Sequence, residues 1–199
     1  MAWNRKPQRG PTARSFLACG CGLTRSPERA AHLAGAGLEP VGGELRRPET
    51  YAAAAAACDG AVHLGYEPGP GAEDVDRLAL ESLVDAAHGG GRLRSVVYTS
   101  GVWVMGRHRG GPSVEEDPPA PLPVVAWRPA LERAALEAGG RGLSAAVVRP
   151  GCVYGGRGGL YGRMLLAAVE DHEVPLAGNG RNAWAAVYRD DLAELYRLV

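Results

Sequence analysis

The sequence predicts an α/β fold: a doubly wound parallel sheet with helices on both faces, whose first βα unit is atypical or missing. Strand and helix patterns alternate along most of the 199 residues, as they do in successive βαβ units. The run Val96-Val97-Tyr98 is short, apolar and bounded by turn residues, which is typical of a buried strand in a parallel sheet.

The N-terminal segment, residues 1–23, is predicted to be irregular or disordered because basic residues alternate there with glycine and proline. An ordered domain is expected over 24–199. Its first helix starts at Pro27, since Ser26 is a good N-cap residue and proline is favoured at the first helical position. The helix should end at Gly35 or Gly37.

The next elements follow from apolar runs separated by turn residues. Pro48 opens an alanine-rich helix, and a triple glycine ends the longest helix of this half. In order, the predicted elements are a strand at 38–41, a helix at 48–57, a strand at 61–64, a helix at 73–88 and a strand at 96–99.

The second half repeats the alternation after a proline-rich loop at 112–123. Its predicted elements are a helix at 127–138, a strand at 144–148, a helix at 160–171, a strand at 183–188 and a helix that begins at Asp190. In such sheets ligands bind just beyond the carboxyl ends of the strands, so the corner Thr99-Ser100-Gly101 is a candidate site.

Composition and charge exclude several functions. Acidic and basic residues balance at 22 each, so neither nucleic acid nor an anionic membrane is an expected partner. No apolar run approaches the roughly 20 residues that span a bilayer, and the polar N-terminus lacks the apolar core of a secretory signal. We expect a cytoplasmic protein, and the Ala-, Gly- and Arg-rich composition is associated with a GC-rich bacterial genome.

The four cysteines do not predict a metal site. Cys19 and Cys21 are separated by one residue rather than by the two of a zinc knuckle, and no second pair completes four ligands. They are expected to be reduced thiols without a metal.

Several short segments, in the expected order and spacing, resemble motifs of the extended short-chain dehydrogenases/reductases, the NAD-dependent epimerase/dehydratase family. They are Thr24-Arg25-Ser26-Pro27, Gly43-Glu44-Leu45-Arg46, Val62-His63-Leu64-Gly65, Val97-Tyr98-Thr99-Ser100, Arg149-Pro150-Gly151-Cys152-Val153-Tyr154-Gly155 and Asp190-Asp191-Leu192. The resemblance implies a Rossmann-like domain over 24–199, with a substrate-side region that starts at about residue 151.

The resemblance also implies NAD or NADP as cofactor and assigns site residues. The cofactor contacts would be Arg25, Glu44, Leu45, His63, Leu64, Thr99, Arg128, Pro150 and Val153. Ser100 and Arg128 would be the catalytic pair. Two alternatives stay open: Arg25 reads the 2′-phosphate of NADP or is a solvated arginine, and Arg128 contacts the ribose or faces solvent.

Two family features are missing from the sequence. No glycine-rich Gly-x-x-Gly-x-x-Gly turn precedes Thr24, so a cleaved start or a shifted reading frame is one hypothesis, and the chain also resembles a family member truncated after Val199. The catalytic Tyr-x-x-x-Lys pair aligns with Val124 and Arg128, or after a slip of three residues with Trp127 and Leu131.

The expected function is therefore that of an NAD(P)-binding protein, ancestrally an oxidoreductase or epimerase on a small hydroxyl- or carbonyl-bearing substrate such as a nucleotide sugar. The alternative is an inactive family member that acts as a binding or regulatory protein, or a degraded fragment. Whether the chain is an enzyme stays open, as does the oligomeric state, for which a homodimer is one candidate.

Overall fold

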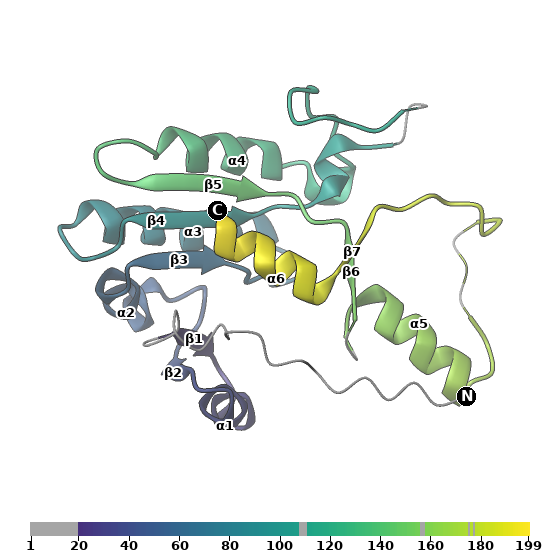
Figure 1. The fold of residues 1–199 in the computed structure, drawn as a ribbon, viewed down its shortest axis with the longest axis horizontal. Coiled ribbons are helices and arrows are strands. Elements are labelled where there is room, and N and C mark those ends of the chain that lie inside the picture. The colour runs from purple at the N-terminus through teal and green to yellow at the C-terminus, as the bar shows by residue number, and fades with distance from the viewer. Residues whose placement is uncertain (1–19, 108–110, 156–157, 175, 177) are drawn as a thin grey trace.

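A computed structural model describes residues 20–107, 111–155, 158–174, 176 and 178–199. The described strands form parallel pairs in three groups, ordered β1-β2, β3-β4-β5 and β6-β7 (Figure 1). The predicted α/β class with parallel strands is confirmed. Among the described strands, however, hydrogen-bonded pairing does not run from one group to the next.

The first group is a small βαβ unit made of β1 (Cys21–Thr24), α1 (Pro27–Gly35) and β2 (Glu39–Gly42). The Ser26 hydroxyl accepts a hydrogen bond from the amide of Arg29 at 3.3 Å, which caps α1 as predicted. β1 starts before the expected domain boundary at residue 24, and residues 1–19 lie outside the described part of the chain. No residue of α1 is buried.

The second group carries the main core. Its elements are a 3₁₀ turn η2 (Pro48–Thr50), α2 (Ala52–Ala57), β3 (Gly60–His63), α3 (Ala72–His88), β4 (Ser95–Thr99), 3₁₀ turns η3 (Val102–Met105) and η4 (Pro123–Val125), α4 (Arg128–Glu137) and β5 (Ser144–Val148). They lie close to the predicted ranges. β4 is central, with Val96 aligned to Ala61 on one side and Ala145 on the other.

Side chains of β4 alternate between two helix layers. Val96 and Tyr98 pack against α3 and α4, together with Leu80 and Leu131. Val97 faces the other side, in a smaller cluster with Leu192 of α6 (Arg189–Leu198). Helices therefore cover both faces of this group, as the doubly wound class requires.

In the doubly wound strand order, one further strand lies between the positions that β1 and β3 occupy here. No described residue supplies that strand. β1 pairs only with β2 and β3 only with β4 among the described strands, and Val62 of β3 is 42% exposed. The expected atypical or missing first βα unit would precede β1, in a part of the chain outside the described residues, and it stays a prediction.

The third group consists of β6 (Cys152–Tyr154), α5 (Gly159–Glu170) and β7 (Ala186–Tyr188). The strand predicted at 183–188 is shorter, because its partner β6 has three residues and the register runs from Cys152–Ala186 to Tyr154–Tyr188. In Figure 1, α5 lies apart from β3, β4 and β5. Gly162 is the one buried residue of α5.

Candidate functional site

The candidate site is the carboxyl end of β4, where the chain turns away at Ser100. The amide of Ser100 donates to the Val148 carbonyl at 2.8 Å, and that of Val102 donates to the Pro150 carbonyl at 3.1 Å. These bonds continue the β4–β5 pairing beyond both strands and fix the corner. The Ser100 side chain is buried, and its hydroxyl has no hydrogen-bond partner among the described residues.

Arg128, the first residue of α4, reaches the same strand end. Its Nη1 donates to the Thr99 carbonyl at 3.1 Å, and its guanidinium lies over the Tyr66 ring, 5.4 Å from the centroid. The side chain is only 11% exposed, which removes the alternative that it faces solvent. Its Nε is buried and, like the Ser100 hydroxyl, has no partner in the described part of the structure.

Behind this corner lies a buried carboxylate, Asp76 of α3. One oxygen is 2.9 Å from Nε2 of His63. The other accepts hydrogen bonds from the Tyr98 hydroxyl at 2.8 Å and the Trp127 indole at 3.1 Å, and lies 3.7 Å from Nη2 of Arg128. We call these five residues the Asp76 cluster.

The cluster shifts the pKa values of its own members. Burial would raise the pKa of Asp76, but the hydrogen bonds from His63, Trp127 and Tyr98 and the charge of Arg128 hold it below the usual range. Burial and the neighbouring carboxylate raise the pKa of Tyr98. Asp76 is thus an ionised acceptor and Tyr98 a permanent donor at neutral pH.

Asp76 is not among the predicted site residues, although the sequence contains a signal for it. The buried face of α3 comprises Ala72, Val75, Asp76, Ala79, Leu80, Leu83 and Ala87. A single acid on that helical stripe must find donors in the interior, because an unpaired buried charge is strongly unfavourable.

Four predicted site residues lie together, at the carboxyl ends of β4 and β5. They are Thr99, Ser100, Arg128 and Pro150. The Thr99 hydroxyl is 2.7 Å from the hydroxyl of Tyr196 in α6. Val153 packs in the α6-side cluster beside Val97, so its side chain belongs to the core around the site.

The two predicted residues of β3 and its following loop point in different directions. The His63 ring faces inward to Asp76 and is 4% exposed. Leu64 is 64% exposed. Next to it, Gly65 allows the loop after β3 to pass close to the Leu45 side chain, which follows β2. A Cβ at Gly65 would lie 2.6 Å from a Leu45 methyl carbon.

The remaining predicted residues belong to the β1–β2 group and the segment after it. Arg25 forms an ion pair of 3.4 Å with Glu67, which also pairs with Arg46 at 2.9 Å. The Glu44 amide donates to the Thr50 hydroxyl at 3.1 Å, and the Leu45 carbonyl accepts from the Tyr51 hydroxyl at 3.3 Å. Two arginines therefore converge on one carboxylate at this edge.

Neither alignment of the family tyrosine places a proton-transferring side chain at the corner. Val124 lies in η4 and is 53% exposed. The indole of Trp127 is bound to Asp76, and Leu131 is buried in the core.

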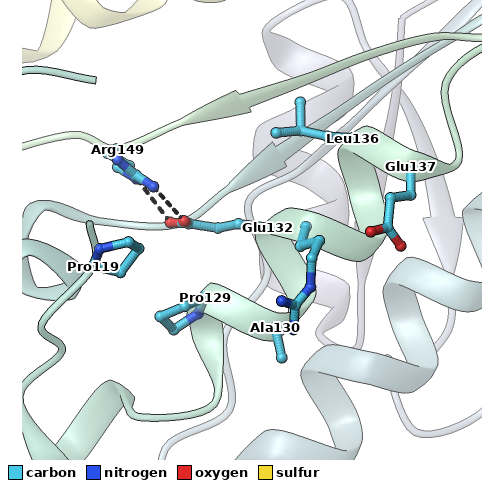
Figure 2. A pocket seen from close by; sticks show the side chains of 8 residues that line it. Pro119, Pro129, Ala130, Glu132, Leu136, Glu137 and Arg149 are labelled. Atoms are coloured by element: carbon cyan, nitrogen blue, oxygen red, sulfur yellow. Dashed lines mark hydrogen bonds and ion pairs between the residues drawn. The ribbon is translucent and has the colours of Figure 1, made fainter. Parts of the chain in front are cut away.

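A hollow of about 650 Å³ lies beside α4, lined by Pro119, Pro129, Ala130, Glu132, Arg133, Leu136, Glu137 and Arg149. Figure 2 shows the Arg149 side chain pointing at Glu132 across two hydrogen bonds, of 3.0 and 2.6 Å. Its third nitrogen donates to the sulfur of Met105 at 3.3 Å. The Arg149 guanidinium in this hollow is therefore engaged by Glu132 and Met105.

Within the described residues, no group of three or more His, Cys, Asp and Glu side chains could hold a metal ion. In the same part of the chain, no helix combines the length and the apolar character that crossing a membrane requires.

The profile of the NAD dependent epimerase/dehydratase family matches residues 20–199. An uncharacterized protein of Schizosaccharomyces pombe is 30% identical over 184 residues, covering 89% of this chain and 60% of that protein. The 4-hydroxy-2-methyl-3-oxo-4-farnesyl-3,4-dihydroquinoline-1-oxide ketoreductase of Stigmatella aurantiaca is 28% identical over 168 residues, covering 80% of this chain and 50% of that enzyme. This chain therefore spans between half and two thirds of the length of these relatives.

Among solved structures, dTDP-glucose 4,6-dehydratase from Bacillus anthracis in complex with NAD superimposes with a TM-score of 0.78 at 19% identity, over 94% of this chain and 64% of the dehydratase. At that identity the likeness establishes the Rossmann-type fold. The family profile, which spans the chain from β1 to α6, confirms the family expected from the ordered motifs. The chain belongs to the NAD-dependent epimerase/dehydratase family.

Proposed function

We propose that the chain binds a nicotinamide dinucleotide, with the ribose and nicotinamide end at the carboxyl ends of β4 and β5, and acts on a small hydroxyl- or carbonyl-bearing molecule such as a nucleotide sugar. The observation that carries the proposal is the pair of buried, unpartnered groups at that corner, Ser100 Oγ and Arg128 Nε. Buried polar atoms without partners are rare in folded proteins, and a ligand that supplies those partners accounts for them.

This end of the site fits the cofactor. Arg128 can donate to ribose hydroxyls from the position that the family lysine occupies, and Ser100 can donate to a substrate or ribose oxygen. The dinucleotide, when bound, supplies hydride transfer. Ser100 and Arg128 bind and orient, and we assign no described side chain as the carrier of the proton.

The pyrophosphate end fits less well. The family binds that group at a glycine-rich turn before a helix N-terminus, and no described residues form such a turn. The start of α1 is already occupied, because the Ser26 hydroxyl accepts from the Arg29 amide and Pro27 has no N–H. Affinity is therefore expected to come mainly from the two ends of the dinucleotide.

At the adenine end we propose a preference for NADP. Arg25 is 63% exposed and Arg46 is 49% exposed, while Glu67 between them is 15% exposed. A 2′-phosphate can accept hydrogen bonds from both guanidinium groups in competition with Glu67, since arginine binds phosphate with several donors in a fixed geometry.

The test is titration of the purified protein with NADH and NADPH, followed by intrinsic fluorescence and by thermal shift. A ligand that binds the folded state alone must raise the unfolding temperature. We expect stabilisation by both, and more by NADPH. Absence of any shift at millimolar concentrations of either dinucleotide would disprove the proposal.

Two variants locate the phosphate contact. Arg25→Ala should weaken NADPH binding selectively, whereas Arg77→Ala, which removes an exposed paired arginine of α3, should leave both affinities unchanged. An equal loss for NADH and NADPH in Arg25→Ala would exclude Arg25 as the phosphate contact.

A second candidate function is dinucleotide binding without catalysis. It is favoured by the residues at the two alternative tyrosine positions, Val124 and Trp127. Valine has no ionisable group in its side chain, and the indole N–H of Trp127 is hydrogen-bonded to Asp76. Dinucleotide binding without oxidation of NADPH by any of a panel of ketones and nucleotide sugars would support this function over the first.

A further inference from the structure

The Asp76 cluster contains one buried carboxylate and one buried guanidinium, and both belong to the candidate corner. Asp76 is 3% exposed and Arg128 is 11% exposed at their side chains, with 3.7 Å between Oδ2 and Nη2. A buried cation is strongly destabilised when its partner charge is removed. The position of Arg128 therefore depends on more than the single bond to the Thr99 carbonyl.

The two uncharged donors of the cluster, Tyr98 and Trp127, do not need the charge of Asp76. Tyr98 and Trp127 each donate one hydrogen to the same oxygen, which an amide oxygen could accept equally. His63 lies opposite the other oxygen, and whether its Nε2 donates or accepts there depends on the tautomer of the ring. An asparagine could thus satisfy these three neighbours, but it would leave Arg128 without its anion.

We propose that Asp76 is a positioning residue, whose negative charge holds the Arg128 guanidinium at the carboxyl end of β4. It acts on the ligand only through Arg128, because His63, Tyr98 and Trp127 enclose the carboxylate. The effect on the ligand rests on the proposed dinucleotide function. The effect of Asp76 on the position of Arg128 does not rest on that function, so the position of Arg128 and the binding of the ligand can be tested separately.

The first measurement needs no ligand. The Nε–H signal of Arg128 is recorded in ¹H–¹⁵N spectra and assigned by its loss in Arg128→Lys. In Asp76→Asn we expect this proton to exchange with water at least about tenfold faster, because the guanidinium leaves its buried position. The control Glu132→Gln weakens the other buried acid–arginine pair of α4, and it should leave the Arg128 signal within about twofold of wild type.

The second measurement is dinucleotide affinity in the same variants. Asp76→Asn should weaken NADH and NADPH binding at least about tenfold, the equivalent of 1.4 kcal/mol, and Glu132→Gln should bind as wild type does. An Asp76→Asn protein that is folded and keeps both the Arg128 exchange rate and the affinity overturns the proposal. If wild type binds neither dinucleotide, the proposed function fails, while the exchange rates still decide the role of Asp76.

Should Asp76→Asn fail to fold, a double-variant cycle with Arg128→Met keeps the question decidable. If the two charges interact directly, removing both destabilises the protein less than the sum of the single losses, and Asp76→Asn/Arg128→Met regains stability over Asp76→Asn. A double variant no more stable than Asp76→Asn would refute the charge coupling.

Discussion

The β1–β2 group and the β3–β4–β5 group use the same βαβ connection, yet they bury very different amounts of their helices. α3 buries seven residues and helps to form the main core, whereas α1 buries none. Their charged contacts differ in the same way. Asp76 and Glu132 are buried in the second group, but Arg25 and Arg46 meet Glu67, in the loop after β3, at the surface where the two groups touch. The β3–β4–β5 group is therefore expected to contribute more to the free energy of unfolding than the β1–β2 group.

The largest expected difference concerns apolar truncation. Leu80→Ala, at a side chain 2% exposed in α3, should lower the free energy of unfolding by about 2–5 kcal/mol, because it leaves a cavity in the core. Leu33→Ala in α1, which is half-buried against Gly22, should cost about 1 kcal/mol. Urea unfolding measures both. Equal losses would show that the two groups are equally important for stability.

The next effect concerns the pair Glu132–Arg149. Glu132→Gln should lower the free energy of unfolding by about 1–3 kcal/mol, because Arg149, at 26% exposure of its side chain, keeps part of its hydration after losing its anion. Arg149→Met, which removes the charge together with its need for a partner, should cost less in the Glu132→Gln background than alone. Additive losses would contradict the direct pairing.

The β1–β2 group and the β3–β4–β5 group should also differ in how protonation of their carboxylates at low pH changes the free energy of unfolding. The folded-state pKa of Asp76 is lowered from 3.8, so its contribution to stability is complete above that pH and is lost as the pH falls through the lower folded value. Asp76→Asn should remove this part of the acid sensitivity, seen as a flatter unfolding free energy below pH 4. Glu28 in α1 also has a lowered pKa, mainly through its bond to Ser26, but it is fully exposed. Glu28→Gln is therefore expected to leave the acid profile nearly unchanged, and a large change would contradict the distinction.

The smallest effect is expected at the contact between the two groups. Glu67→Gln should change the free energy of unfolding by less than about 1 kcal/mol, since Arg25 and Arg46 are well exposed. Thermal unfolding at low and high salt checks this, because added salt should reduce the difference from wild type. A loss comparable to that of Leu80→Ala would mean that Glu67 holds the groups together.

The sequence predicted the fold well because its evidence was local. Apolar runs and helix caps identified most elements, and the order of motifs identified the family. The grouping of the described strands into three paired sets could not be predicted from local patterns, since strand pairing depends on contacts between residues distant in the sequence. At the site, Ser100 and Arg128 were found by motif position. Asp76 was not, because its importance arises from donors on β3, β4 and α4 that only the folded chain brings together.

The shared carboxylate has a consequence for how such sequences can diverge. Asp76 contacts four side chains at once, those of His63, Tyr98, Trp127 and Arg128. A substitution at any one of these positions therefore changes which hydrogen-bonding or ionic partners the others have. Among homologues, loss of the acid at the position of Asp76 should accompany loss of the cation at the position of Arg128. Residues 52 positions apart in the chain are thus expected to evolve as a unit.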